Sequence, residues 1–565
     1  MTLESGSSIN TDVNFGLSGA IDIDVGNLTL NGGSSISSNV FDDSGLPGAI
    51  IIEVTDRVHL TDLSVISSSS IADIADGGAV SILAADLTLE SGSSIRTDVN
   101  VGLSGAIDIN VGNLTLNENS IISSNAEVDG FAGDITILAA DVSLSNDSSI
   151  ASNGREAAGS GTVFLTADNV LLTLGGGILS NTGDVPGGEI VIDAETLILT
   201  DDRPPDVGLN DTLIAADTSG AGAAGLVEVT VDDLFASNSF IAADTFAEGD
   251  AGNVLVSATA EIFLTDFAQI ATRSNGTGDA GIVVVEAQNL IIEENVEILS
   301  DAEGFGNSGI IDVDANQLTL RTGASINGDV EDGIGGLIKI NGRLLTLSAS
   351  SISSEATGNG VAGAVFIGVD RAFRNITLLD GGNITTEALQ GAGGDIIVNA
   401  ADRVVLDTGT ISTSVVSGGQ NGGDIEITVD DGFIVLHQDT NILTTAVEGD
   451  GGAMLISMNA LYRSRSTRID ASSSLGFDGP VIISGLENPE TSEVSVLPSD
   501  FLDANAVVRN PCLAAFLGRS QLQIMETGVS AGSMQGDSPL LDAATAGELT
   551  LVGGDFSASA EACDG

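Results

Sequence analysis

Pairs of carboxylates two residues apart are the side chains of this chain whose type and spacing could do chemistry. Asp22 and Asp24 form one pair, and Asp312 and Asp314 form another. Two neighbouring carboxylates can act as general acid and general base, as in the hydrolysis of a glycosidic bond. The same spacing arises wherever one face of a β-strand is solvated, so these pairs alone assign no catalytic residue.

A sugar-processing site would also need cations and aromatic side chains beside its carboxylates. The chain has no Trp, a single Tyr and only 16 Lys and Arg among 565 residues. We therefore expect no enzyme, no catalytic residue and no bound cofactor. A β-helical carbohydrate-active enzyme, a polysaccharide lyase or hydrolase, remains the alternative. A groove lined by carboxylates together with Arg or Lys would favour it.

A loop of mixed charge is the best candidate for a binding site. It contains Asp201, Asp202, Arg203 and Asp206, with two prolines between the last two. Proline stiffens a protruding loop, and loops on a rigid scaffold often carry binding function. The segment therefore predicts a binding loop, with a plain tolerated insertion as the alternative.

These side chains lie on a repeat that runs through most of the chain. A glycine followed two and four residues later by an aliphatic residue recurs seventeen times, at intervals of 27 to 37 residues. A period in this range is typical of solenoids, in which each unit contacts only its neighbours. The repeating glycines are Gly19, Gly48, Gly78, Gly105, Gly133, Gly161, Gly188, Gly225, Gly252, Gly281, Gly309, Gly336, Gly363, Gly394, Gly423, Gly452 and Gly479.

One unit, residues 105–130, indicates what each repeat encodes. Segment 107–110 alternates aliphatic and polar residues, a turn at 112–113 leads to a second alternating segment at 114–116, and a short third segment lies at 121–122. Alternation with a period of two predicts strands with one buried face. Of the 34 inward positions in the first strands, 32 are Val or Ile, which pack well on a pleated surface.

Three short strands per unit without a helical connection predict an all-β fold. We expect a right-handed parallel β-helix of about 17 coils over residues 1–485, followed by a different tail over residues 486–565. A sandwich of hairpins would need two-residue Asn-Gly or Asp-Gly turns between neighbouring strands. A leucine-rich repeat would need a helical segment in each unit. The units have neither.

The charge of the chain is strongly one-sided. Asp and Glu number 80, and the formal net charge is −64. Such a surface cannot neutralise phosphates, so we expect no binding to nucleic acid. We expect the acid to form a solvated, self-repelling surface that keeps a long rod in solution. Ca²⁺ held between adjacent turns is the alternative; no ligands are named for it, because the Gly-Gly-x-Gly-x-Asp pattern of calcium-binding β-rolls is missing.

Two further features concern the beginning of the chain and the membrane. No stretch is long and apolar enough to cross a bilayer as a helix, so we expect no transmembrane segment. Residues 2–30 and 88–116 are near copies of each other, and the chain starts in the middle of a coil. We therefore expect it to be the carboxy-terminal portion of a longer secreted protein, or the product of a shortened gene.

The tail adds a specific resemblance. It contains Asn510-Pro511-Cys512, followed by a Ser-x-Leu-x-Ile segment at residues 520–524. Together with repeats of the form Gly-x-Ile-x-Ile-x-Ala-x-x-Leu-x-Leu, it resembles the passenger proteins of two-partner secretion, the filamentous haemagglutinin-like exoproteins. The resemblance covers nearly the whole chain. That family's amino-terminal secretion domain and its Gly-Arg-Gly-Gly-Leu-Pro-Pro segment have no counterpart here.

The resemblance implies a location and a role. A protein of this type is extracellular or attached to the outer-membrane surface, and a partner transporter in the outer membrane exports it. Its role is adhesin-like or structural, with the acidic rod presented to cells, matrix or glycans. Cys512 and Cys563 are the only two cysteines; in an extracellular protein they either form a disulfide or remain free thiols. In some members of the class, a carboxy-terminal disulfide loop holds the protein at the outer membrane.

Overall fold

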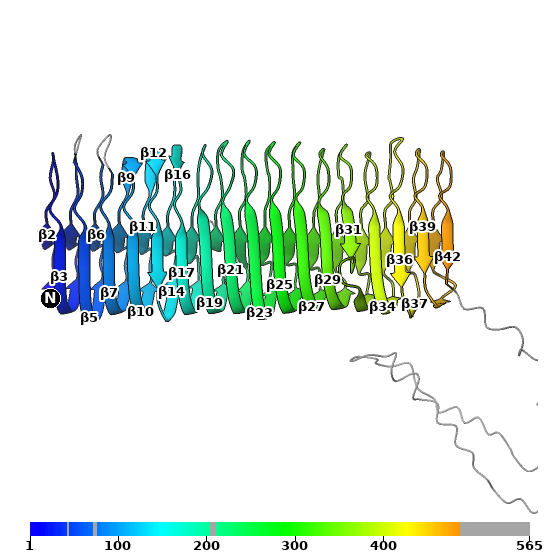
Figure 1. Ribbon diagram of the computed structural model, residues 1–565, viewed down its shortest axis with the longest axis horizontal. Helices are drawn as coiled ribbons and strands as arrows, with labels where there is room; N and C mark the ends of the chain where they lie inside the picture. The colour runs from blue at the N-terminus through cyan, green and yellow to red at the C-terminus, as the bar shows by residue number, and fades with distance from the viewer. Residues whose placement is uncertain (42–44, 72–75, 204–210, 486–565) are drawn as a thin grey trace, which may run out of the picture. The chain divides into compact units, whose positions relative to one another are not determined.

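The computed structural model describes residues 1–41, 45–71, 76–203 and 211–485, and within these ranges it contains strands and loops but no helix. The chain divides into two units, Met1–Glu487 and Asn488–Gly565, and all described residues belong to the first. Figure 1 shows this unit as a row of similar coils, each lying against the next.

The strands form parallel ladders that join residues one coil apart. Ile107, for example, pairs with Val80 of the preceding coil and with Ile135 of the following one. This arrangement confirms the predicted all-β parallel β-helix. One of the sheets of the β-helix has 17 strands, which confirms the predicted number of about 17 coils.

Three sheets run along the stack. The long-strand sheet has 22 strands: β1 (Thr2–Leu3), β3 (Ile21–Leu30), β5 (Ile50–Leu60), β7 (Val80–Leu89), β10 (Ile107–Leu116), β13 (Ile135–Leu138), β14 (Asp141–Ser145), β17 (Val163–Thr173), β19 (Glu189–Thr200), β21 (Leu226–Ser237), β23 (Asn253–Thr265), β25 (Ile282–Glu293), β27 (Ile310–Arg321), β29 (Leu337–Ser348), β31 (Ala364–Ile367), β32 (Phe373–Leu379), β34 (Ile396–Leu406), β36 (Ile425–Val429), β37 (Phe433–Leu436), β39 (Met454–Ser457), β40 (Ala460–Arg463) and β42 (Val481–Ser484).

The short-strand sheet has 17 strands: β2 (Ser8–Asn10), β4 (Ser35–Ser37), β6 (Val65–Ser67), β8 (Ser94–Arg96), β11 (Ile121–Ser123), β15 (Ser149–Ala151), β18 (Gly177–Leu179), β20 (Thr212–Ala215), β22 (Ser239–Ala242), β24 (Gln269–Ala271), β26 (Glu297–Leu299), β28 (Ser325–Asn327), β30 (Ser351–Ser353), β33 (Asn383–Thr385), β35 (Thr410–Ser412), β38 (Asn441–Leu443) and β41 (Arg468–Asp470). A three-stranded loop sheet consists of β9 (Val99–Leu103), β12 (Ala126–Phe131) and β16 (Ala157–Gly159).

The first and second predicted strands of a coil run together as one bent strand in most coils. In β10, Val111 and Leu114 are both buried, whereas the two residues between them, Gly112 and Asn113, are not. Regular alternation would turn residue 113 inward, so this change of phase marks a corner in the strand. The corner lets one continuous strand cover two sides of the core.

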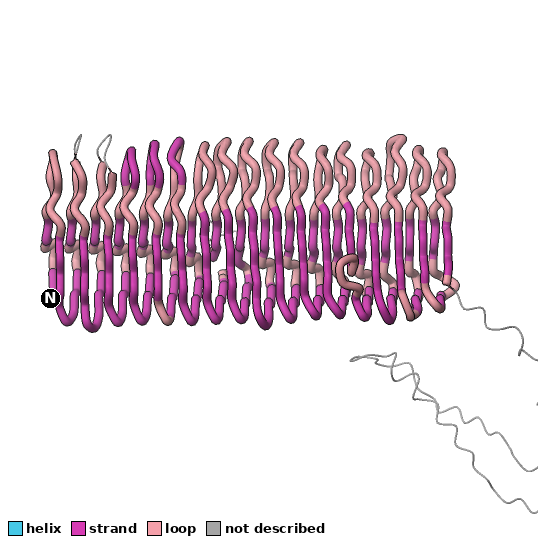
Figure 2. The backbone as a smooth tube through the Cα atoms, in the orientation of Figure 1, coloured by secondary structure: helices cyan, strands magenta, loops and turns pink. Residues whose placement is uncertain are grey.

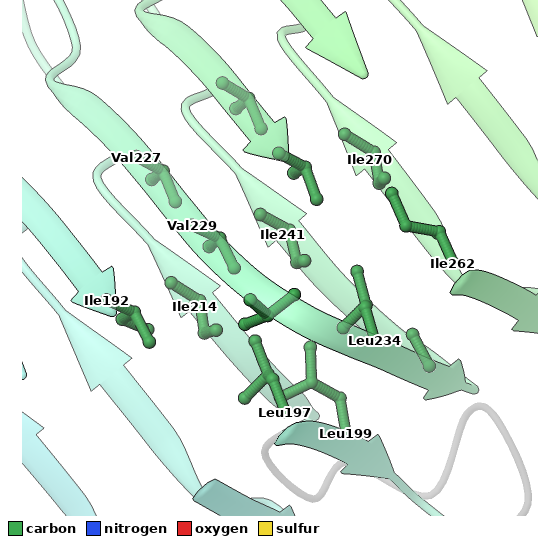
Figure 3. Close-up of a cluster of buried hydrophobic side chains, with 14 of the residues drawn as sticks. Ile192, Leu197, Leu199, Ile214, Val227, Val229, Leu234, Ile241, Ile262 and Ile270 are labelled. Carbon is green, nitrogen blue, oxygen red and sulfur yellow. The ribbon is translucent and has the colours of Figure 1, made fainter. Parts of the chain in front are cut away.

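The core is a single aliphatic column enclosed by the long-strand and short-strand sheets. Every inward residue of the first strands from Ile21 to Ile456 is buried. Figure 3 shows part of this column, where Ile192 and Val229 of the long strands point toward Ile214 and Ile241 of the short strands. Because each coil covers the apolar ends of its neighbours, stability depends on stacking rather than on any one coil.

The repeating glycines form a second column in which backbones touch. A Cβ on Gly133 would lie 2.5 Å from the carbonyl oxygen of Gly105. Ser124, which is fully buried, donates a hydrogen bond to that oxygen at 2.8 Å and accepts one from the Gly133 N–H at 3.0 Å. Glycine recurs because no side chain fits between adjacent coils here, and the serine joins the two backbones.

The return loops that follow the short strands project to one side of the stack (Figure 1). Many of them bury a small residue between neighbouring coils, as Ala302, Val330 and Ala356 do. The loops thus have a narrow core of their own.

Candidate functional site

The outward face of the long-strand sheet gathers carboxylates from successive coils. The parallel register aligns Val284 with Asp312 and Glu286 with Asp314. In the next coil, Lys339 lies beside Asp312, and Asn341 lies beside Asp314. Neighbouring strands are about 4.8 Å apart, so side chains far apart in the sequence become close neighbours. The predicted pair Asp312 and Asp314 therefore has charged and polar neighbours on both sides.

An insertion interrupts the sheet one coil further on. Strand β31 ends at Ile367 and β32 begins at Phe373; the residues between them leave the sheet as a loop, which stands out between the strands in Figure 2. Gly368 starts the loop with a φ of +72°, a conformation that favours glycine. We call Gly368–Ala372 the face loop.

The face loop reaches back over two coils. The Arg371 guanidinium forms a hydrogen-bonded ion pair with Asp314, which lies 57 residues earlier. The backbone N–H groups of Asp370 and Arg371 both donate to the side-chain oxygen of Asn341, each at 3.3 Å. These bonds hold the loop beside the carboxylates of the sheet.

A cavity of about 360 Å³ lies between the face loop and the sheet. It is lined by Val284, Glu286, Asp312, Asp314, Asn341, Asp370 and Arg371. Burial raises the pKa of Asp312; Lys339 counteracts this, while the nearby charges of Asp370 and Asp314 raise the pKa further. We call this cavity the face pocket.

The face pocket combines acceptors and donors within one small space. Its carboxylates can accept hydrogen bonds from ligand hydroxyl or ammonium groups, and Arg371 and Asn341 can donate to ligand oxygens. A carboxyl group whose pKa is raised, such as Asp312, is also the kind of group that can serve as a general acid. The lining contains no aromatic side chain among the residues that the structure describes.

Other carboxylates of the long-strand sheet lie in more open surroundings. Asp22 and Asp24, the other predicted pair, are exposed side by side on β3. The register places Ile51 and Glu53 next to them in the following coil. The two pairs thus have the same spacing in sequence but different neighbours.

Two charged residues of the predicted binding loop bind one another. Arg203 contacts both carboxylate oxygens of Asp201, at 2.8 Å and 2.6 Å, and also reaches Asp147, two coils earlier, at 3.0 Å. Burial alone would raise the pKa of Asp201, but the hydrogen bonds from Arg203 outweigh it and lower that pKa. Asp201 is only 5% exposed, so this pair fastens the base of the insertion. Asp202 next to it is exposed.

Three predicted residues lie outside the described ranges. Asp206 belongs to the segment 204–210, and Cys512 and Cys563 belong to the tail. The role of Asp206 in binding and the pairing of Cys512 with Cys563 remain predictions.

A partly buried acidic ladder was not foreseen from the sequence, which predicted that the acid lies on a solvated surface. Just after the short strands, a side-chain oxygen in one coil accepts the backbone N–H of the next coil. The side chain of Asn181 accepts the N–H of Asp217 at 2.9 Å. The side chain of Asp217 accepts the N–H of Asp244 at 2.8 Å, and the side chain of Asp244 accepts the N–H of Arg273 at 2.6 Å. Desolvation and the charge of Asp244 raise the pKa of Asp217 to about 7.

A second cavity, of about 510 Å³, lies between the short strands and the return loops near the start of the chain. Its polar groups are mostly bonded to one another, since Ser37 donates to Asp12 and Ser67 donates to Asn39. The face pocket is the better candidate, because its carboxylates face an open space with fewer internal partners.

The structure also bears on metals and membranes. Within the described ranges, no three His, Cys, Asp or Glu side chains converge in a way that could hold a metal ion. The same part of the chain offers no helix that could cross a bilayer.

One feature of the sequence signals the face pocket. The interval between Gly363 and Gly394 is 31 residues, and the face loop falls between the two halves of that coil's long strand. An insertion at that point must project from the outward face, next to carboxylates of preceding coils. The insertion contains two charged residues, Asp370 and Arg371, and therefore indicates a place where a binding site could form.

The chain was compared with protein-family models, with curated proteins and with solved structures, and it matches none of them.

Proposed function

We propose that this protein is a secreted or surface-attached exoprotein of the filamentous haemagglutinin-like type, exported through an outer-membrane transporter. Its acidic β-helical rod acts as an adhesin-like or structural element that is presented to other cells, matrix or glycans.

The observation that supports this proposal most is the unbroken core. The inward column stays aliphatic and buried from Ile21 to Ile456, so the coils stack without a break over this part of the chain. A solenoid of this kind offers a long surface for contacts with extended partners. Its net charge of −64 favours solubility outside the cell and disfavours anionic partners.

Two measurements test the proposal. Fractionation of the native cells should recover the chain in the medium or on the cell surface, where external protease digests it. The purified full chain should bind intact cells, matrix or glycans without changing the length of a glycan. Recovery only from the cell interior, or a failure to bind any of these surfaces, would contradict it.

A carbohydrate-active enzyme is the second candidate, and the face pocket favours it. Glu286, Asp312 and Asp314 lie together with Arg371, which is the combination of groups that sugar cleavage needs. Incubation of the chain with a panel of polysaccharides distinguishes the two candidates. New reducing ends or unsaturated sugar products, lost in Asp312→Asn, would favour the enzyme.

A further inference from the structure

We propose that the face pocket binds an amino sugar, a glycan unit that carries a protonated primary amine. This inference rests on the proposed function, because it names the chemical class of glycan that the rod would recognise.

The first argument is the charge of the face pocket. Four carboxylates, those of Glu286, Asp312, Asp314 and Asp370, line it. Arg371 pairs with Asp314, and Lys339 lies beside Asp312. Four negative against two positive groups leave an excess of two negative charges. A cationic ligand is therefore attracted, and an anionic one is repelled.

The second argument is Asn341, which is 7% exposed and lines the same cavity. Its side-chain oxygen accepts the two N–H groups of the face loop, so the orientation of the amide is fixed. Among the described residues, the side-chain NH₂ group of Asn341 has no hydrogen-bond partner. Its nitrogen atom is not fully buried by surrounding protein atoms either. A donor that is held in place and open to the cavity requires an acceptor on the ligand.

Together these features select the ligand class. The ligand must bring a cation to the carboxylates and an oxygen acceptor to Asn341 within one small cavity. An amino sugar does this, because hydroxyl groups occupy the carbons next to the one that carries the ammonium group. A lysine side chain separates its ammonium from its nearest acceptor by a long methylene chain. Val284 is the single apolar lining residue, so an aromatic or lipid ligand would find little surface to pack against.

Calorimetric titration of the full chain tests the inference. The probes are a glucosamine tetramer at pH 6, its N-acetylated counterpart, a neutral glucose tetramer and a lysine tetrapeptide. We expect the glucosamine tetramer to bind most tightly. Asp312→Asn and Glu286→Gln should each weaken it by about tenfold or more, because each removes a charged partner of the ammonium group.

Asp108→Asn is the matched control. Asp108 occupies in β10 the outward place that Asp312 occupies in β27, and it is exposed. This variant should bind like the unmodified chain, and circular dichroism and thermal melting should show that all variants are folded.

Several results would overturn the inference. These are no binding of the glucosamine tetramer, equal binding of its N-acetylated form, tighter binding of the lysine peptide, or an equal loss in Asp108→Asn. Cell binding is measured separately. If the unmodified chain binds the glucosamine tetramer but no cell, matrix or polymeric glycan, the proposed function fails while the pocket assignment stands. If it binds cells but not the glucosamine tetramer, the pocket assignment fails while the proposed function stands.

Discussion

The ring of Phe373 occupies the space that a side chain on Gly342 would fill. A Cβ on Gly342 would lie 2.7 Å from Cε1 of Phe373 and 2.1 Å from the carbonyl oxygen of Ala315. Phe373 is fully buried and directly follows the face loop, as the first residue of β32. A large ring in one coil thus fits over a glycine in the preceding coil, and this contact anchors the loop that closes the face pocket.

We therefore expect Gly342→Ala to destabilise the coils around the face loop. The added methyl group must displace Phe373 or the backbone of Ala315, and such overpacking costs about 1–3 kcal/mol. The midpoint of urea unfolding measures the effect. Gly26→Ala is the control, because a Cβ on Gly26 meets no atom within 4 Å. Equal midpoints for the two variants would contradict the close fit of the Phe373 ring over Gly342.

Removal of the serine hydroxyl that joins two coils should also lower stability. In Ser124→Ala, the N–H of Gly133 and the carbonyl of Gly105 lose a buried partner, so we expect a loss of about 1–3 kcal/mol in the free energy of unfolding. Ser81→Ala, on the outward face of β7, should change it by less than about 0.5 kcal/mol. A Ser124→Ala protein as stable as the Ser81→Ala protein would show that this hydroxyl contributes little.

The acidic ladder makes stability depend on pH. The pKa of Asp217 is about 7 in the folded chain and about 4 in an unfolded one. Between these values the folded state keeps a proton that the unfolded state releases, so the contribution of Asp217 to stability falls as the pH rises from about 4 to about 7 and is lost above about 7.

Asp217→Asn should remove this dependence. Asparagine keeps the acceptor oxygen but cannot ionise, and Asn181 already fills the equivalent place one coil earlier. We expect the variant to be more stable than the unmodified chain at pH 8 by about 1 kcal/mol or more, and nearly equal to it at pH 4. Asn181→Asp should have the opposite effect at pH 8. Urea unfolding at both pH values measures these differences, and parallel pH profiles for all three proteins would refute the assignment.

The base of the predicted binding loop depends on the ion pair between Arg203 and the buried Asp201. In Arg203→Met, Asp201 stays buried without the guanidinium that neutralises it, and loss of one partner from such a pair costs about 3 kcal/mol. The double variant Arg203→Met with Asp201→Asn should recover part of that loss, because the most deeply buried carboxylate is then neutral. Thermal melting of the single and double variants measures the recovery. If the double variant is less stable than Arg203→Met alone, Asp201 contributes to folding without its partner.

The sequence alone was sufficient for the repeat architecture. Alternation with polar residues identifies inward residues such as Ile107 and Ile109. Recurrence at a nearly constant interval identifies the repeating glycines, such as Gly105 and Gly133. Both are local patterns repeated many times, so no long-range contact had to be inferred. The bend in the long strand was indicated only by the turn at residues 112–113, and its continuity was not foreseen.

The tertiary structure decided where the chemistry lies. Asp314 and Arg371 are 57 residues apart, and only the coil-to-coil register and the direction of the face loop bring them together. Asp217 reads in sequence as one more solvated acid, yet desolvation and the charge of Asp244 in the next coil raise its pKa to about 7. A period in the sequence fixes which residues stack, whereas the environment of each side chain depends on which groups the neighbouring coils place beside it.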